Sequence, residues 1–291
     1  MSEEDETKTT GDVIANINYF PPTGQPIPVS AWKPRYIGAS YQHTRRMTIH
    51  DVRLTTKTFS LQTNGFQFVK LSPRQRVTAT DDEVTINRTY YPELSDLVKK
   101  LTGASTAFVF NHVIRAHSSP SQKGILDAFG RWQDIPAAHP HVDYSGSPAH
   151  IAGTRRELSP NFPPEIASLY DSSSRIAYVN VWRPLSTVRR DPLAVCDCAT
   201  VPDEDYQVRL RRFSRTGVES GNYVMSHARE EETHEWWYMS AMREDEVVVF
   251  REYDSEMRGG WRCPHTAFEL EGTEEVEPRE SIEARVVCFW E

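Results

Sequence analysis

The chain is divided into many short segments of β-type sequence, and this pattern restricts its fold more than any other feature. The segments are rich in β-branched and aromatic residues, and turn residues, including most of the 19 prolines, lie between them. Eleven segments show the pattern: 13–20, 47–54, 66–71, 83–89, 106–113, 175–182, 193–198, 222–227, 235–240, 246–251 and 281–290. We therefore predict a mainly β fold.

Two segments carry helical signals instead. Residues 91–103 begin with a proline and a glutamate, place leucines at helical spacing, and end with two lysines and Gly103, which suits a left-handed cap. Residues 163–170 begin in the same way and are shorter. We predict two helices here, both packed at the periphery of a β core.

No boundary divides the chain into separate domains. Residues 1–11 lack apolar periodicity and are predicted to form a disordered tail. From residue 12 onward there is neither a low-complexity linker nor a repeat of fixed period. Although 291 residues could form two small domains, we predict a single domain spanning residues 12–291.

Composition argues against several classes of function. Lysine and arginine total 33 against 41 acidic residues, a net charge of −8, so no general basic field could hold a nucleic acid. The longest apolar runs, such as 106–110, are far shorter than the roughly 20 residues of a membrane helix. The amino terminus is acidic where a secretory signal would be basic and then apolar, so we expect a cytoplasmic protein with free cysteine thiols.

The most informative polar motif is His141-Val142-Asp143. On an extended segment, side chains two residues apart leave the same face, so His141 and Asp143 could bind one metal ion. One further histidine would complete the two-histidine, one-carboxylate triad that leaves coordination positions open on non-haem iron(II). The alternative is a surface histidine without a ligand role. His139 shares the parity of His141, but Pro140 interrupts the segment, and we place His139 outside the ligand set.

A distant histidine and two arginines could complete such a site. His265 lies 122 residues after Asp143, and Arg279 follows it by 14 residues. On the last β segment, Arg285 shares its parity with Arg279 and with other polar residues, whereas the opposite parity is apolar. The polar row could line a cofactor pocket, or it could be the solvent face of an amphipathic strand.

Residues 175–184 offer further candidates. Tyr178, Asn180 and Trp182 alternate on one face of the predicted strand, so Tyr178 or Asn180 could hydrogen-bond a cosubstrate, or all three could be core residues. Arg183 lies on the other parity and could bind a substrate carboxylate or lock a neighbouring loop. Tyr144, next to the His-x-Asp motif, could form part of an aromatic wall around a substrate.

Several sequence blocks follow one another over nearly the whole chain. They are Leu101–Ala104, Phe110–Arg115, His141–Ser145, Asn180–Leu185, Asp191–Ala194, Cys196–Asp197, Glu252–Ser255, Pro264–Phe268 and Arg279–Arg285. In these blocks the chain resembles the fungal and bacterial hydroxylase/desaturase family of secondary-metabolite clusters, which includes the gibberellin desaturase and the cephamycin-pathway 7α-hydroxylase. The resemblance is to the family and covers the chain after about residue 12.

The resemblance implies an iron(II)/2-oxoglutarate-dependent oxygenase on a double-stranded β-helix core, of the jelly-roll or cupin-like type. Carried over by position, His141, Asp143 and His265 would bind iron(II). Arg279 would anchor the distal carboxylate of 2-oxoglutarate, because the planar guanidinium pairs with a carboxylate in a bidentate manner. Arg285 is the alternative anchor.

The implied reaction begins with hydrogen abstraction by a ferryl-oxo species and ends in hydroxylation, desaturation or ring formation on a small secondary-metabolite intermediate. The expected partners are this small molecule and molecular oxygen, with neither nucleic acid nor membrane, and a homodimer is compatible with the sequence. The alternative is a β-barrel protein that binds a metal or ligand without 2-oxoglutarate-dependent chemistry.

Overall fold

The computed structural model describes residues 11–27, 41–71, 77–116, 136–213 and 216–291. The predicted tail at residues 1–11 therefore lies, except for residue 11, outside the described residues. The elements are β1 (Val13–Asn18), β2 (Thr44–Asp51), β3 (Phe66–Lys70), α1 (Glu83–Thr102), β4 (Thr106–Arg115), β5 (His141–Val142), α2 (Pro148–Leu158), α3 (Pro164–Ser172), β6 (Arg175–Pro184), β7 (Leu193–Cys196), β8 (Tyr206–Arg212), β9 (Glu219–Met225), β10 (Trp236–Tyr238), β11 (Glu246–Asp254), β12 (His265–Ala267) and β13 (Ser281–Trp290).

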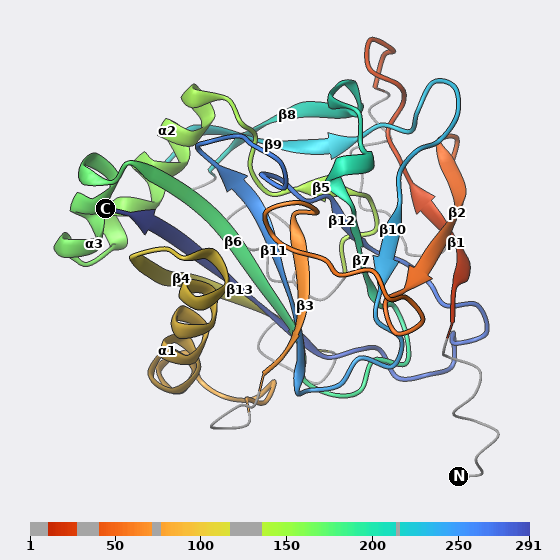
Figure 1. Ribbon diagram of the computed structural model, residues 1–291, viewed down its shortest axis with the longest axis horizontal. Helices are drawn as coiled ribbons and strands as arrows, with labels where there is room; N and C mark the ends of the chain where they lie inside the picture. The colour runs from red at the N-terminus through yellow and green to blue at the C-terminus, as the bar shows by residue number, and fades with distance from the viewer. Residues whose placement is uncertain (1–10, 28–40, 72–76, 117–135, 214–215) are drawn as a thin grey trace.

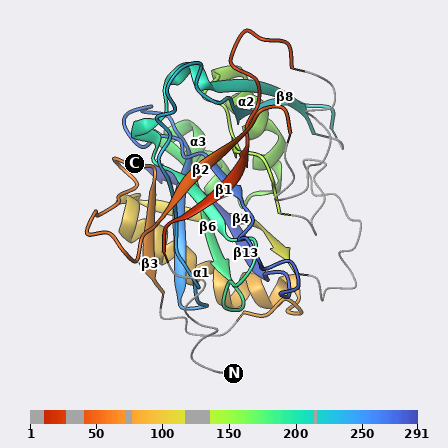
Figure 2. The same ribbon diagram turned by 90° about the vertical axis from the view of Figure 1, so that its right-hand side faces the viewer.

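The strands form two sheets that face each other. One has eight strands in the order β1-β2-β10-β7-β12-β5-β9-β8, and the other has five in the order β3-β11-β6-β13-β4. Figure 2 shows β1 and β2 of the larger sheet in front of β6 and β13 of the smaller one.

The connections identify the architecture. From β4 to β7, and again from β10 to β13, each successive strand lies in the opposite sheet. This alternation is that of the double-stranded β-helix, so the mainly β, jelly-roll prediction is confirmed. Because the chain crosses between sheets at each of these steps, residues far apart in sequence meet between the two layers.

Successive side chains along β13 point to opposite faces of the five-stranded sheet, one toward α1 and the other toward the eight-stranded sheet. Ile282, Ala284, Val286 and Cys288 are buried in one apolar cluster with α1, which covers the outer face of the five-stranded sheet (Figure 1). Burial of each large apolar side chain contributes about 1.5–3 kcal/mol. Arg285, of the opposite parity, points toward the eight-stranded sheet, where it reaches Asp143.

One predicted strand is wrong. Residues 83–89 form the first turns of α1, which begins eight residues earlier than the sequence suggested. The Asp82 side chain accepts a hydrogen bond from the Thr85 amide at 2.7 Å and caps the helix. Ile86 and Tyr90, four residues apart, then face the sheet together with residues of the predicted helix. The other ten predicted segments each overlap a strand.

The structure also bears on two simpler expectations. Cys196, Cys263 and Cys288 are buried free thiols, and Cys198 is a partly exposed one. Within the described ranges, no helix combines the length and apolarity needed to cross a bilayer.

Candidate active site

Three predicted metal ligands converge between the two sheets. His141 in β5 is the antiparallel partner of His265 in β12, and their ring centroids are 4.3 Å apart. Asp143 follows β5 directly, on the same face as His141. One ligand atom from each of the three lies within 4.8 Å of the others, and the residues are only 3–5% exposed. Strand pairing therefore brings His265 beside the His141 and Asp143 pair that sequence spacing predicted.

The two imidazoles present equivalent nitrogens to the centre of this cluster. Nδ1 of His141 lies 3.0 Å from the His139 carbonyl oxygen, and Nδ1 of His265 lies 3.3 Å from the Cys263 carbonyl and 3.2 Å from Glu252 Oε1. Since a backbone carbonyl oxygen only accepts, Nδ1 carries the proton in each ring. Nε2 of each ring is then a lone-pair donor for a metal ion.

Only one of the two carboxylate oxygens of Asp143 accepts the hydrogen bonds that orient this side chain. Its Oδ2 accepts hydrogen bonds from Asn180 Nδ2 and Arg285 Nε, each at 3.2 Å. Its Oδ1 faces His141 Nε2 at 3.8 Å. The carboxylate is thus oriented to offer Oδ1 as a single ligand atom beside the imidazoles.

This donor set suits a divalent transition-metal ion. Two imidazole nitrogens and one carboxylate oxygen on adjacent positions are the ligands of the facial triad of non-haem iron(II). The buried carboxyl of Glu252 lies beside the triad, and burial together with the nearby Asp143 raises its pKa well above the ordinary value. A bound cation would offset the negative charge that is gathered here.

The two candidate arginines have different surroundings. Arg285 is engaged with the triad itself, because besides Asp143 it contacts Asn111 Oδ1 at 3.4 Å and Glu283 Oε1 at 3.2 Å. Asn111 and Asn180 flank Arg285 on the neighbouring strands β4 and β6. These contacts fix Arg285 as a residue that orients Asp143.

Arg279 precedes β13 and is 7% exposed. Its Nη1 donates to the Asp191 carbonyl, its guanidinium carbon lies 5.0 Å from the Trp182 ring centroid, and its Nε has no partner among the described residues. Burial, and to a lesser degree Arg115, lowers the pKa of this guanidinium. Trp182 and Asn180 are two residues apart on the same face of β6, a separation of about 7 Å along the strand. Arg279 contacts Trp182 and Asp143 contacts Asn180, so Arg279 lies next to the triad along this face. The buried Arg279 guanidinium, whose Nε–H has no acceptor among the described residues, could pair with an anionic ligand at this position.

Aromatic rings form one wall near the triad. The Tyr144 and Tyr178 rings stack with centroids 4.5 Å apart, and Tyr178 Oη lies 3.0 Å from Tyr170 Oη of α3. Tyr144 Oη is buried and has no hydrogen-bond partner within the described residues. Tyr144 is therefore a candidate donor to a bound molecule, whereas the hydroxyl of Tyr178 is already paired with another tyrosine.

Arg183 lies on the opposite face of β6 from Asn180. Its Nε donates to the Glu244 carbonyl at 2.7 Å, and its guanidinium carbon lies 5.4 Å from the Tyr90 ring of α1. It thus contacts the helix that covers the outer face of the sheet and does not join the triad, which matches the loop-locking alternative rather than substrate binding.

Sequence reasoning overlooked Glu252. It lies in a block that carried the family resemblance, but no role was predicted for it. The available signal was alternation: Phe250, two residues earlier in β11, packs on His265 with ring centroids 4.7 Å apart, so Glu252 shares the inward face.

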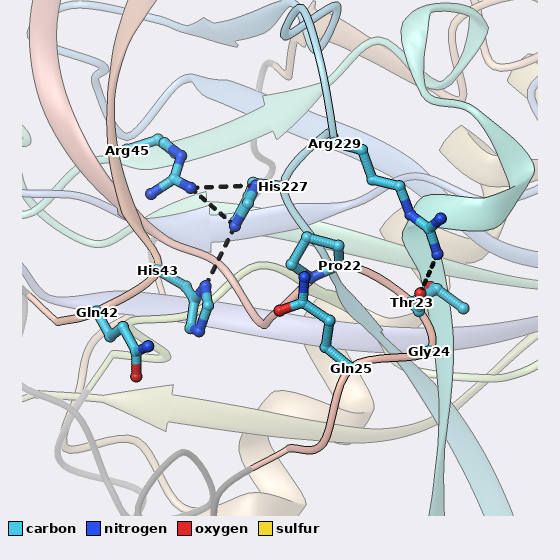
Figure 3. Close-up of a pocket in the computed structure, with 9 residues that line it drawn as sticks. All are labelled: Pro22, Thr23, Gly24, Gln25, Gln42, His43, Arg45, His227 and Arg229. Carbon is cyan, nitrogen blue, oxygen red and sulfur yellow. Dashed lines mark hydrogen bonds between the residues drawn. The ribbon is translucent and has the colours of Figure 1, made fainter.

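A hollow that includes none of the triad residues lies between residues 22–25, 42–45 and 227–229 (Figure 3). It encloses about 560 Å³. Its basic side chains are directed at one another and at the backbone: Arg45 Nη2 lies 2.8 Å from His227 Nε2, His43 Nδ1 lies 3.2 Å from the same atom, and Arg229 donates to the Thr23 carbonyl. We assign this hollow no part in the chemistry of the triad.

The architecture and the triad together define a class, the non-haem iron oxygenases built on a double-stranded β-helix. Residues 15–289 match the family model described as "Oxidoreductase/YMDC permease-like domain". The chain is 32% identical over 268 residues to the hydroxylase/desaturase efuI of Hormonema carpetanum, covering 86% of this chain and 85% of that protein. It is 33% identical over 265 residues to the Fe(II)/2-oxoglutarate-dependent dioxygenase nvfI of Aspergillus novofumigatus, covering 88% of each.

Solved structures agree with these relatives. The iron and alpha-ketoglutarate-dependent endoperoxidase NvfI superposes with a TM-score of 0.72 at 26% identity, covering 97% of this chain and 99% of that one. The chain belongs to this family of hydroxylases, desaturases and 2-oxoglutarate-dependent dioxygenases. The predicted class, an iron(II)/2-oxoglutarate-dependent oxygenase, is confirmed, and the alternative of a β-barrel without such chemistry finds no support among the relatives.

Proposed function

We propose that His141, Asp143 and His265 bind iron(II), that Arg279 anchors 2-oxoglutarate, and that the chain oxidises a small secondary-metabolite intermediate. The observation that carries the assignment is the convergence of the three buried ligand atoms within 4.8 Å. The chemistry supplied by bound iron(II) and 2-oxoglutarate is the activation of dioxygen, coupled to decarboxylation of the keto acid to succinate.

The residues of the chain have distinct tasks in this reaction. The two imidazoles and Oδ1 of Asp143 would hold the metal, and a three-residue ligand set of this kind leaves coordination positions for other ligands. Arg285 and Asn180 keep the other oxygen of Asp143 occupied, so that it does not turn toward the metal. In this proposal Asn180 and Arg285 both act on the ligand Asp143, and their contacts with its Oδ2 support that role.

Arg279 is the anchor that the surroundings favour. Nη1 is fixed by the Asp191 carbonyl, and Nε has no partner among the described residues, so the guanidinium is held in place with donors left for a carboxylate. The Trp182 ring beneath it excludes water from one side. A charge-assisted bidentate pair in such a setting is stronger than one exposed to solvent.

The substrate side is assigned to the aromatic wall. The Tyr144 hydroxyl would donate to a polar group of the substrate, and the stacked Tyr144 and Tyr178 rings would exclude water from this side of the site. Relatives are named hydroxylase/desaturase, gibberellin cluster desaturase and endoperoxidase, so hydroxylation, desaturation and oxidative ring formation are the reactions to test. We place the reaction in the cytoplasm, within one domain spanning residues 12–291.

The test is the formation of succinate from 2-oxoglutarate by the purified protein with iron(II) and oxygen. We expect the wild type to form succinate and the His141→Ala and Asp143→Ala variants to lose this activity. His139→Ala is the matched control, because it keeps the backbone carbonyl that contacts His141 and removes only a neighbouring imidazole. Full activity in either triad variant would contradict the assignment.

A further inference from the structure

The hollow shown in Figure 3 takes no part in the chemistry of the triad, but it gathers basic side chains. His43 and Arg45 from the start of β2, and His227 and Arg229 from the segment after β9, line it, and none of its described lining residues is acidic. We call this space the basic hollow. The chain as a whole carries a net charge of −8, so the basic hollow is a locally positive space on an acidic protein, which favours a negatively charged ligand.

Neither arginine of the basic hollow is paired with an acid in the described part of the chain. Arg45 donates from Nη1 to the Thr44 carbonyl at 3.0 Å and from Nη2 to His227 Nε2 at 2.8 Å. Arg229 donates from Nη2 to the Thr23 carbonyl. Because a guanidinium has five N–H donors, both arginines keep donors for a further ligand.

The partner of Arg45 supplies no negative charge. Arg53, another partly buried arginine, forms a bidentate ion pair with Glu246 at 3.0 and 2.6 Å. Arg45 instead contacts His227, whose Nδ1 lies 2.7 Å from the Ala228 carbonyl oxygen. Since that oxygen only accepts, the proton of the imidazole lies on Nδ1, and Nε2 accepts from Arg45 as a neutral group. The positive charge of Arg45 therefore remains available to an anion.

The acidic residues that follow Arg229 in the sequence do not line the basic hollow. Glu230 and Glu231 are exposed and are not among its lining residues. Glu232 accepts a hydrogen bond from the Ala228 amide at 3.2 Å, and its Oε1 lies 3.1 Å from Nδ1 of His234. These carboxylates thus leave the space between the two arginines to a ligand.

The basic hollow lies alongside the face of the eight-stranded sheet that carries the triad. His141 and Val224 are antiparallel partners, so their side chains leave the sheet on the same face. Phe20, two residues before the lining segment 22–25, packs on Val224. The Phe20 ring also contacts that of His139 at 5.5 Å between centroids, and the His139 ring lies 5.8 Å from that of His141. Two ring contacts therefore connect the edge of the basic hollow to a metal ligand.

We propose that the basic hollow binds an anionic group, a carboxylate or a phosphate, and that this group is the acidic end of the small molecule that the chain oxidises. Arginine side chains pair with such groups through charge-assisted hydrogen bonds. A molecule held in this way extends past Phe20 and His139 toward the triad, so that binding far from the reacting carbon positions it. The identity of the anion's carrier rests on the proposed function, whereas anion binding itself does not, because no triad residue lines the basic hollow.

The first experiment is calorimetric titration of inorganic phosphate into the metal-free full-length protein. We expect saturable binding to the wild type, about tenfold weaker binding to Arg45→Gln, which loses a charge-assisted donor, and about threefold weaker binding to Arg229→Gln, whose side chain is exposed to solvent. Arg46→Gln is the matched control. Arg46 is the next residue of β2, is exposed and points to the opposite face, so its replacement should leave phosphate affinity unchanged.

Three results would overturn the inference. They are the absence of phosphate binding to the wild type, wild-type affinity in both Arg45→Gln and Arg229→Gln, and a loss of affinity in Arg279→Gln with none in Arg45→Gln, which would place the anion at the cosubstrate anchor. Because Arg229 is exposed, Arg229→Gln tests the site even if Arg45→Gln does not fold.

The second experiment distinguishes the acidic end of a larger molecule from a free anion. The protein loaded with Co²⁺ and 2-oxoglutarate is titrated with acetate and with 8-phenyloctanoate, which carries the same carboxylate on a long apolar body. We expect 8-phenyloctanoate to bind more tightly than acetate, to change the visible Co²⁺ spectrum, and to lose this affinity in Arg45→Gln. If the two acids bind alike and neither changes the spectrum, the basic hollow holds a free anion, and the substrate part of the proposal is refuted.

His265→Ala separates this inference from the proposed function. It should lose Co²⁺ binding but bind phosphate like the wild type, because His265 does not line the basic hollow. Wild-type Co²⁺ affinity in His265→Ala would refute the triad and leave the phosphate result standing. Loss of phosphate binding in His265→Ala would instead refute the basic hollow as an independent site.

Discussion

Arg279→Gln should abolish tight binding of 2-oxoglutarate while leaving the metal site intact. In the structure the Arg279 guanidinium is buried, Nη1 is fixed by the Asp191 carbonyl, and the buried Nε has no partner in the described residues. Two charge-assisted hydrogen bonds to a carboxylate contribute about 1.5–3 kcal/mol each. Taking the lower value for both gives about 3 kcal/mol, or roughly a 100-fold loss of affinity.

Calorimetric titration of 2-oxoglutarate into the Mn²⁺-saturated protein measures this loss directly. Arg279→Lys keeps the charge but not the planar fork, so it should fall between Arg279→Gln and the wild type. Arg285→Gln is the informative comparison: because Arg285 holds Asp143, it should weaken Mn²⁺ binding, with 2-oxoglutarate affinity at saturating Mn²⁺ close to that of the wild type. If Arg279→Gln binds 2-oxoglutarate within twofold of the wild type and Arg285→Gln does not, the assignment of the anchor is refuted.

Three further predictions concern metal, pH and packing. Mn²⁺ at about 100 times its Kd should stabilise the wild type by about 2.7 kcal/mol, seen as a higher melting temperature that EDTA reverses, and an equal rise in His141→Ala would contradict the triad. Burial would raise the pKa of Glu246, but the Arg53 side chain and the Arg243 amide lower it overall. The ionised Glu246 therefore stabilises the fold at pH values above its ordinary pKa near 4.5, and this stabilisation is lost as the pH falls through the lowered pKa. Glu246→Gln should thus cost about 1–3 kcal/mol near neutral pH and progressively less in acid, whereas a constant difference in urea unfolding would refute the ion pair. Gly153→Ala in α2 would place a methyl carbon 1.9 Å from the Glu219 carbonyl oxygen and should destabilise the protein by more than 1 kcal/mol; unchanged chemical denaturation would show that α2 does not pack on β9 as described.

Two of the candidate metal ligands, His141 and Asp143, could be predicted because their arrangement depends on short-range geometry. The two-residue spacing of His141 and Asp143 fixes their common face wherever the segment is extended, and the structure keeps it. The alternation along residues 281–290 likewise predicted which side chains of β13 enter the core, and Ile282 and Ala284 do so. The pairing of His141 with His265, across more than 120 residues, followed from the family resemblance and not from spacing.

What sequence reasoning missed depends on contacts between distant elements. Glu252 lies close to His265 because β11 lies opposite β5 and β12. No sequence pattern within β11 predicts this contact. The sequence left Arg285 as an alternative anchor to Arg279, because its contact with Asp143, which supports the proposal of Arg279, has no sequence signal. The segment 83–89 was assigned to a strand because its β-branched residues favour one, and the cap at Asp82 and the packing of α1 on the sheet override that preference.

The most direct test of the central claim is the visible absorption of the iron(II)-loaded protein on anaerobic addition of 2-oxoglutarate. Chelation of iron(II) by the keto acid produces a metal-to-ligand charge-transfer band. We predict this band in the wild type and in His139→Ala, and its absence in His141→Ala and His265→Ala. A wild-type protein that binds iron(II) but gives no band, or an undiminished band in His265→Ala, would contradict the claim that these residues form an iron(II)/2-oxoglutarate site.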